Sequence, residues 1–237
     1  MDVTMNLTKL RLSACLFTSF AFLSACTGTN NNGSGRPVSV VVAPMAVHTS
    51  YFKDKQSNDF RSLDQSVSKD PNFDAFTLWF YHCFADFQTE DEHVDDTAGA
   101  SSVRLKIKSL QVRLSCPVTV WMSHDASALV RAHEKGHVFI CRKIYDIAPA
   151  VVREAASGVV GMSFNGMGSN IGEARRMAVA QAEGEIAQAF RDKVVGRADQ
   201  ISINYDRLCY DEIARNDQSE ATQQKNAEES CQQYIEP

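Results

Sequence analysis

The stretch His133-Glu134-Lys135-Gly136-His137 reads H-E-x-x-H and lies in a region with helical periodicity. Two histidines at this spacing lie on the same face of a helix, a little over one turn apart. Both imidazoles can therefore reach one tetrahedral zinc ion, for which metal–nitrogen bonds measure about 2.0–2.1 Å. Glu134 lies between them, at the position of a general base that acts on a water molecule. The motif predicts a zinc site whose third ligand comes from elsewhere in the chain.

The helix that carries the motif is expected to begin near Ser123 or Asp125, either of which can cap it, and to run to about Ile147. Pro149 is expected to break or restart the helix, because proline lacks the backbone N–H of a helix interior. A second helical piece is expected to continue to about Ser157. Gly136 inside this helix costs about 1 kcal/mol relative to alanine. Its presence indicates that another segment passes close to the helix.

Three strands are expected before the motif helix, at residues 38–47, 76–87 and 101–121, and a short amphipathic helix at 57–67. Within 101–121, Cys116-Pro117 is expected to end the run, and another short piece starts at Val118. An acidic loop is expected at 89–97, after the second strand. The third strand carries the clearest pattern. Its apolar residues first occupy odd-numbered positions and then even-numbered ones. This change of phase predicts a β-bulge or a break near Ser109. The two apolar sets are Val103, Leu105 and Ile107, then Leu110, Val112 and Leu114.

After the motif helix, the glycine-rich residues 158–169 are expected to form a mobile loop. Asn170 can cap a second long helix over residues 171–195. A brief strand or extended entry is expected at 201–203, mixed helix and turn at 205–216, and a polar surface tail at 217–229. These elements predict an α+β fold, in which a small mixed or antiparallel sheet packs on the motif helix and the second long helix.

The beginning of the chain has the features of an export signal. A short basic region precedes an apolar run from Leu12 to Leu23 that is too short to span a bilayer comfortably. The run ends in Ser24-Ala25-Cys26, which resembles the bacterial lipobox. The resemblance implies a signal peptide at 1–25, lipidation of Cys26, and a flexible tether at 26–37 ahead of one domain at 38–237. The residue after Cys26 is Thr27 and not aspartate. In this respect the chain resembles Gram-negative lipoproteins that are sorted to the periplasmic side of the outer membrane.

The net charge and the apolar runs of the chain indicate which classes of partner it can bind. The net charge is -5, and removal of residues 1–25 makes it about -6. A mildly acidic chain without a basic block is not built to bind nucleic acid. No second apolar run is long enough to cross a membrane, so membrane contact is expected only through the lipid at Cys26.

Cysteine usage fits an exported protein, in which disulfides are permitted. Of the seven cysteines, Cys15 leaves with the signal peptide and Cys26 takes the lipid, so an odd number remains and at least one thiol is expected to be free. The expected pairs are Cys83 with Cys116, on adjacent strands, and Cys209 with Cys231, near the end of the chain.

Several of these features together resemble a bacterial family of unknown function that is described as secreted or periplasmic zinc-dependent proteases. They are the aromatic strand 76–79, a central strand with a cysteine, Leu129, the motif itself, and Tyr205-Asp206. In that family a segment resembling Tyr-Asp-x-x-Thr-x-His-Gly follows a second long helix. Here the segment is residues 205–212, and it departs from the family after its first two positions. The family's histidine falls on Asp211, its threonine on Cys209 and its glycine on Glu212.

The resemblance implies a zincin-like fold and a third zinc ligand at Asp211, because an aspartate oxygen is an acceptable zinc ligand. Glu173, at the start of the second long helix, and Glu154, beyond the motif, are alternatives. Tyr205 and Tyr210 are candidates to donate a hydrogen bond to an oxyanion.

The expected function is that of a zinc-dependent endopeptidase of the bacterial cell envelope, with Glu134 as the base and a peptide or protein as the substrate. A strand edge between Leu110 and Val120 is expected to bind the substrate in extended form. The alternative is a non-catalytic envelope lipoprotein that uses a zincin-like fold as a binding or structural module. The departures at Asp211 and Glu212 favour this alternative.

Overall fold

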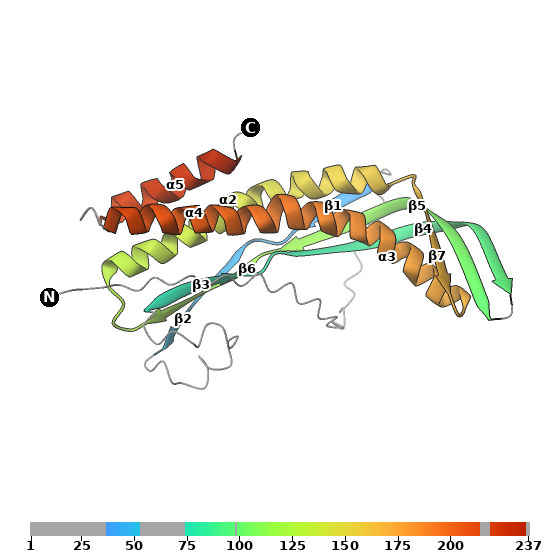
Figure 1. Ribbon diagram of the computed structural model, residues 1–237, viewed down its shortest axis with the longest axis horizontal. Coiled ribbons are helices and arrows are strands. Elements are labelled where there is room, and N and C mark those ends of the chain that lie inside the picture. Colours follow the sequence, from blue (N-terminus) through green and yellow to red (C-terminus); the bar gives the residue numbers. More distant parts are fainter. Residues whose placement is uncertain (1–36, 53–73, 98, 214–218, 236–237) are drawn as a thin grey trace.

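The computed structural model describes residues 37–52, 74–97, 99–213 and 219–235, and Figure 1 shows their arrangement. The described chain is a mixture of strands and helices, so the predicted α+β class is confirmed. The predicted signal peptide, the lipidation site Cys26 and the predicted helix at 57–67 lie outside the described residues. The elements, in chain order, are β1 (Val38–Val42), β2 (Ala46–Phe52), β3 (Ala75–Trp79), β4 (His82–Thr97), β5 (Ala100–Ser115), β6 (Pro117–Ser123), α2 (Ala128–Val159), β7 (Ser163–Gly168), α3 (Ile171–Phe190), a π-helical turn η2 (Arg191–Val195), α4 (Gly196–Ile213) and α5 (Glu220–Ile235).

The strands form two sheets. In the larger one, β5 lies between β4, which is antiparallel to it, and two other strands: β1 pairs with residues 110–114 in parallel, and β7 pairs with residues 101–106 antiparallel. In the smaller sheet, β6 lies between β2 and β3. The three predicted strands are therefore real. The first two are each divided in two, at residues 43–45 and 80–81, and the predicted break at Cys116-Pro117 is confirmed at residue 116.

Two long helical segments lie side by side along the larger sheet (Figure 1). One is α2, and the other is the continuous run of α3, η2 and α4, which returns in the opposite direction. The last helix, α5, packs against α2 and α4. Within the described part of the chain, no helix has both the length and the apolar composition needed to cross a membrane.

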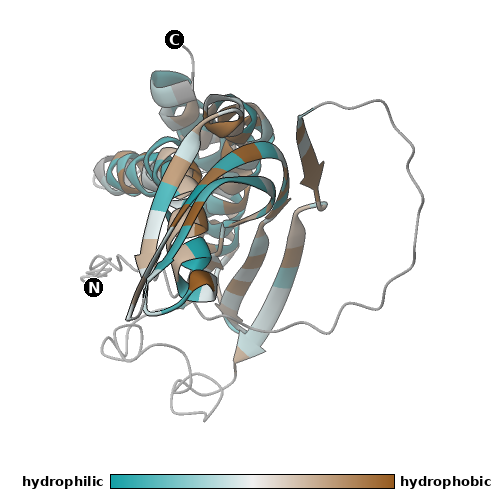
Figure 2. Ribbon diagram, turned by 90° about the vertical axis from the view of Figure 1, so that its right-hand side faces the viewer, coloured by the Kyte–Doolittle hydropathy of each residue, from teal (hydrophilic) through white to brown (hydrophobic). Residues whose placement is uncertain are grey.

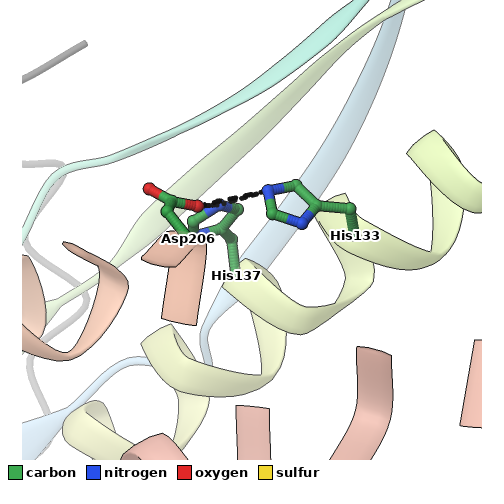
Figure 3. Close-up of side chains that lie close together, drawn as sticks. All are labelled: His133, His137 and Asp206. Atoms are coloured by element: carbon green, nitrogen blue, oxygen red, sulfur yellow. Dashed lines mark hydrogen bonds and ion pairs between the residues drawn. The ribbon is translucent and has the colours of Figure 1, made fainter. Parts of the chain in front are cut away.

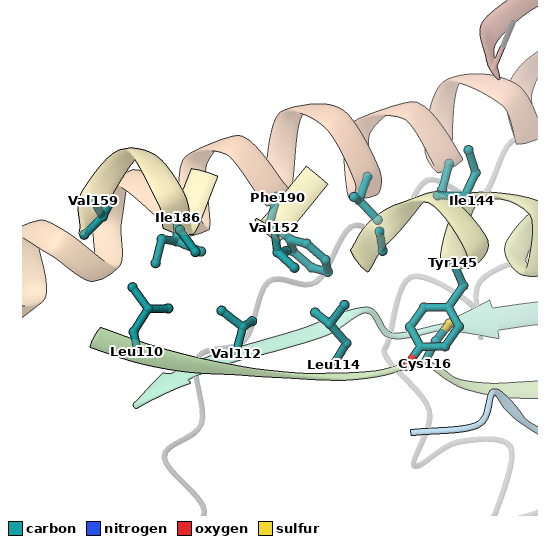
Figure 4. Close-up of a cluster of buried hydrophobic side chains, with 14 of the residues drawn as sticks. Leu110, Val112, Leu114, Cys116, Ile144, Tyr145, Val152, Val159, Ile186 and Phe190 are labelled. Atoms are coloured by element: carbon teal, nitrogen blue, oxygen red, sulfur yellow. The ribbon is translucent and has the colours of Figure 1, made fainter. Parts of the chain in front are cut away.

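The main core fills the space between β5 and the long helices (Figure 4). Burying one valine, leucine, isoleucine or phenylalanine side chain contributes about 1.5–3 kcal/mol to the free energy of folding. These contacts therefore hold the helices on the sheet. Hydrophobic and hydrophilic residues alternate along the strands, as Figure 2 shows. The side chains labelled in Figure 4 are Leu110, Val112, Leu114 and Cys116 from the sheet side and Ile144, Tyr145, Val152, Val159, Ile186 and Phe190 from the helices.

The predicted bulge is confirmed at Lys108. Ser109 pairs with Gln88 and Ile107 pairs with Thr89, so Lys108 is an extra residue in β5 that has no strand-pairing position opposite it on β4. The extra residue reverses the side-chain alternation. Both apolar sets of β5 are consequently buried on the same face of the sheet.

The predicted acidic loop at 89–97 is wrong, because these residues form the distal half of β4. They pair with β5 as far as Thr97 and Ala100. Their charges have partners on β5: Lys108 binds Glu90 at 2.8 Å and Arg104 binds Glu92 at 3.1 Å. A run of acidic residues is compatible with a strand when basic residues lie opposite it.

The predicted mobile loop at 158–169 is also wrong, because residues 163–168 form β7. Its glycines allow a close approach to α3. A Cβ on Gly166 would lie 1.8 Å from the carbonyl oxygen of Ala174, and a Cβ on Gly168 would lie 2.7 Å from the nitrogen of the same residue. Here glycine indicates tight packing between a strand and a helix rather than a flexible connection.

The helices are more continuous than the sequence predicts. Pro149 lies inside α2, where Ala148 and Val152 are completely buried and hold the helix on the core at either side of it. Gly196 continues the second long helix, so the predicted strand at 201–203 is wrong. The predicted polar tail includes α5, which buries Ala227 and Cys231. In each case tertiary packing overrides local propensity.

The predicted disulfides are absent, because all five described cysteines are free thiols. Cys83 pairs across the sheet with Leu114, so it is out of register with Cys116. The thiol of Cys209 contacts Gln223 and Asn226 on α5 instead of Cys231, which lies further along the same helix. The free thiols are Cys83, Cys116, Cys141, Cys209 and Cys231.

Candidate metal centre

The H-E-x-x-H motif lies in the first third of α2. The helix begins after Ser127, whose hydroxyl oxygen accepts a hydrogen bond from the backbone N–H of Val130 at 3.2 Å. Ser127, rather than Ser123 or Asp125, is therefore the N-cap. His133 and His137 project from the same side of the helix, and their side chains are only 15% and 10% exposed.

A carboxylate from α4 meets the two histidines (Figure 3). Asp206 Oδ1 lies 3.2 Å from Nε2 of His133 and 3.0 Å from Nε2 of His137. The two Nε2 atoms are themselves 3.2 Å apart. These three residues are the one group of His, Cys, Asp or Glu side chains in the described residues with the spacing of a metal site.

The other nitrogen of each imidazole has a partner on a neighbouring helix. Nδ1 of His133 lies 3.2 Å from the side-chain oxygen of Gln223 on α5. Nδ1 of His137 lies 3.4 Å from the hydroxyl of Ser202 on α4. An acceptor at Nδ1 keeps the proton there and directs the lone pair of Nε2 toward the site. Both histidines are thus arranged to present Nε2.

The charges in the site are strongly coupled. Burial lowers the pKa of His133, but hydrogen bonds to Asp206 and Cys209 and the charge of Glu134 outweigh it and raise this pKa well above its usual value. Burial raises the pKa of Asp206, but the charge of His137 and the hydrogen bonds with both histidines hold it well below the usual range. Without a metal ion, Asp206 is ionised and stabilises a proton on His133.

Glu134 lies beside this group and is 5% exposed. Its Oε2 accepts a hydrogen bond of 2.6 Å from the hydroxyl of Thr77, on β3. Two positions further along β3, the ring of Trp79 stacks on His137 with centroids 6.1 Å apart. Strand β3 therefore fixes both the glutamate and one histidine of the motif.

Tyr205 is placed beneath the site. It is fully buried, its ring stacks on His133 with centroids 4.9 Å apart, and its hydroxyl donates to the carbonyl oxygen of His133 at 3.1 Å. Burial is the largest cause that raises the pKa of this phenol, which stays neutral. A Cβ on Gly136 would lie 2.2 Å from the Tyr205 hydroxyl, so the predicted close approach at Gly136 is that of Tyr205.

This placement gives Tyr205 a supporting role rather than the predicted oxyanion contact, since its hydroxyl is used on the buried side of α2. Tyr210 is 54% exposed on α4. No hydrogen bond joins it to the two histidines or Asp206 among the described residues.

The carboxylate near the histidines is Asp206, not one of the three residues proposed from the sequence. Asp211 lies on the same helix, one and a half turns further along, and its side chain lies outside the described part of the structure. Glu173 accepts hydrogen bonds from Ser169 at the start of α3, and Glu154 lies 3.6 Å from Lys193. Neither of these glutamates joins the metal group.

The residues that sequence reasoning missed, Asp206, Ser202 and Gln223, lie on two helices that it did not predict. Helical periodicity over 196–213 places Ser202 and Asp206 on one face, one turn apart, and would have shown them as a pair. Gln223 carries no local signal, because its role depends on the packing of α5. Comparison of the chain with protein-family models, with curated proteins and with solved structures finds no match.

Proposed function

We propose that this chain is a zinc-dependent peptidase of the bacterial cell envelope. The observation that carries the proposal is the convergence of three lone pairs. Nε2 of His133, Nε2 of His137 and Oδ1 of Asp206 lie 3.0–3.2 Å from one another, and both Nδ1 atoms have acceptors. Three acceptors directed at one point repel each other unless a cation or protons lie between them.

The ligand set favours zinc. In a tetrahedral site with bonds of about 2.0–2.1 Å, ligand atoms are about 3.3–3.4 Å apart, close to the separations found here. Two imidazoles and one carboxylate are typical of catalytic zinc sites, which leave a fourth position open. The Asp206 side chain is 54% exposed, so the site is accessible from solvent.

The mechanism assigns each side chain a separate task. A bound zinc ion supplies the Lewis acidity that lowers the pKa of a water molecule. Glu134 accepts a proton at its free carboxylate oxygen and delivers it to the leaving amine, while its Oε2 is held by Thr77. Trp79 limits the access of water to His137 by covering one face of its ring.

A peptide substrate would bind in extended form along β3. The strand edge expected between Leu110 and Val120 is not available, because β5 and β6 each have neighbours on both sides. Among the described strands, β3 has a single neighbour, β6, and it carries Thr77 and Trp79 into the site. Hydrogen bonds from an edge strand suit peptides of varied sequence.

The cellular location is proposed from the sequence. The apolar run, the small residues before Cys26 and the polar tether support lipidation of Cys26 and attachment to the outer membrane on its periplasmic side. Strand β1 begins at Val38, directly after the predicted tether. Metabolic labelling with a fatty-acid analogue, compared between the wild type and Cys26→Ala, tests the anchor.

Metal analysis and a peptidase assay together test the function. Purified wild type should contain about one zinc ion per chain, and His133→Ala should contain none, while His124→Ala, near the start of α2, should match the wild type. Glu134→Gln should keep the zinc and lose cleavage of a quenched-fluorescence peptide library. Glu154→Gln, an exposed glutamate on the same helix, is the matched control and should cleave normally.

The outcomes separate the two functional classes. A wild type that takes up no zinc would refute the zinc site and the peptidase with it. A wild type that binds zinc but cleaves no library peptide, with Glu134→Gln indistinguishable from it, would favour the non-catalytic binding or structural module.

A further inference from the structure

The side-chain oxygen of Gln223 gathers three donors in the interior of the protein. It lies 3.2 Å from Nδ1 of His133, 3.1 Å from the hydroxyl of Tyr205 and 2.9 Å from the thiol of Cys209. Gln223 is 2% exposed. The Tyr205 hydroxyl has one proton, which it shares between this oxygen and the carbonyl oxygen of His133. The thiol of Cys209 and the Nδ1–H of His133 are matched by an acceptor at this place, which is the amide oxygen rather than its NH₂ group.

We propose that Gln223 is the positioning residue for His133, so that the last helix of the chain, α5, is part of the metal site. By accepting a hydrogen bond from Nδ1–H, Gln223 leaves the lone pair of His133 on Nε2 and aims it at Asp206 and His137. The proposal rests on the zinc site proposed above and goes beyond it, since Gln223 is not a ligand. Partners of this kind typically change metal affinity by about 10–100-fold.

Two contacts fix His133 in complementary ways. The hydrogen bond to Gln223 sets which nitrogen carries the proton and the direction of the ring edge. The stacked ring of Tyr205, inclined by 17° to the imidazole, sets the ring plane. Because the Tyr205 hydroxyl also contacts Gln223, the amide holds both rings together.

Helix α5 is held at this position from both ends. Lys135, within the motif, binds Glu220 in the first turn of α5 at 2.8 Å. Further along, Ala227 and Cys231 join the main core. Gln223 lies between these attachments, so its position does not depend on the exposed ion pair alone.

His137 provides an internal comparison. Its Nδ1 contacts Ser202 at 3.4 Å, a longer contact than that of His133 with Gln223. The ring of His137 is covered by Trp79 instead of Tyr205. Loss of the Ser202 hydroxyl should therefore weaken metal binding less than loss of the Gln223 acceptor.

The test is a zinc competition titration against a chromophoric chelator, with no activity readout. Gln223→Met keeps the shape and removes the acceptor, and it should bind zinc about 10–100-fold more weakly than the wild type. Gln223→Glu keeps an acceptor and should restore binding to within about threefold of the wild type. The control is Gln224→Met, on the exposed side of α5, which should match the wild type.

Nitrogen-15 NMR of the imidazoles reports the positioning directly. In the zinc-loaded wild type, the Nδ1–H of His133 should be protected from exchange with water, and in Gln223→Met it should exchange rapidly. If Gln223→Met fails to fold, as judged by circular dichroism, Gln223→Glu and the wild-type exchange data decide the question.

Failure of the inference is distinguishable from failure of the zinc site. A wild type that binds zinc, together with a Gln223→Met variant that binds it as tightly, overturns the role of Gln223 alone. Equal weakening in Gln223→Glu and Gln223→Met also overturns it, because the acceptor would then be irrelevant. A wild type without zinc affinity overturns the proposed site itself.

Discussion

Thr77 donates a hydrogen bond of 2.6 Å to Oε2 of Glu134, joining β3 to the motif helix across 57 residues of sequence. Both residues are buried. The hydroxyl is the hydrogen-bond donor to a carboxylate that has been withdrawn from water, and such a carboxylate is costly to leave without a donor. One oxygen of Glu134 is therefore held in place, and the other is left for chemistry.

Replacement of Thr77 by valine should remove this bond without a change of shape. We expect a loss of about 1–3 kcal/mol in the free energy of unfolding, because Glu134 keeps its burial and loses its donor. Peptidase activity should fall through kcat, while zinc affinity stays within error of the wild type. Urea unfolding and zinc titration measure the two effects. Thr77→Ser should restore both values, and a full effect in that variant would argue against the hydrogen bond.

Asp206 and Asp211 make opposite predictions for metal binding. Asp206→Asn should lose zinc, because the structure places its Oδ1 against both Nε2 atoms. Asp211→Asn should keep it, because Asp211 lies about 7.5 Å further along α4. Zinc content after dialysis, measured by plasma mass spectrometry, distinguishes the two. Retention of zinc by Asp206→Asn and its loss in Asp211→Asn would restore the ligand predicted from the family resemblance.

Zinc binding should release about one proton near neutral pH. The pKa of His133 is raised well above its usual value despite burial, so the free site holds a proton that the metal must displace. Zinc affinity should therefore rise with pH until that raised pKa is passed. In the metal-free protein the same shift stabilises the folded state below the usual histidine pKa, and this contribution is lost as the pH rises through the raised value.

Calorimetric zinc titrations in buffers of different ionisation enthalpy count the released protons. Affinity that falls between pH 6 and 8, or a titration without proton release, would contradict the assigned coupling between His133 and Asp206.

The sequence was most informative where periodicity and chemistry are local. The motif spacing fixed His133, Glu134 and His137 on one helix, because a helix turns at a constant rate. The reversal of apolar phase in β5 located the bulge within one residue, at Lys108 rather than Ser109. Asn170 caps α3 as predicted, with its side chain accepting from the backbone of Glu173 at 2.9 Å.

The sequence was least informative where contacts between distant segments determine the local structure. Gly166 contributed to the prediction of a mobile loop, but glycine is required there because the backbone of Ala174 approaches it closely. Gly196 reads as a helix end but lies inside a continuous helical run, because Val194 and Ala198 on either side of it are buried. The third carboxylate was missed for the same reason. Once residues 201–203 are taken as a strand or extended entry and 205–216 as mixed helix and turn, Asp206 has no fixed helical face.

Deletion of Lys108 tests the role of the bulge in folding. Without the extra residue, β5 would keep a single alternation, and one of its two apolar sets would face solvent. We expect the variant to lose cooperative thermal unfolding by circular dichroism. Lys108→Ala keeps the chain length and loses only an exposed ion pair with Glu90, so it should unfold like the wild type. Cooperative unfolding of the deletion variant would show that β5 can realign without the bulge.

The two helix glycines Gly136 and Gly184 should respond oppositely to alanine. A Cβ at Gly184 meets nothing within 4 Å on the exposed side of α3, so Gly184→Ala should stabilise the protein by about 0.5–1 kcal/mol. A Cβ at Gly136 would meet the Tyr205 ring, which contacts both His133 and Gln223. Gly136→Ala should therefore cost about 1–3 kcal/mol and weaken zinc binding together with stability. Denaturant midpoints and zinc titrations of the two variants measure this, and a stabilised Gly136→Ala that still binds zinc normally would show that Tyr205 does not hold His133 in place.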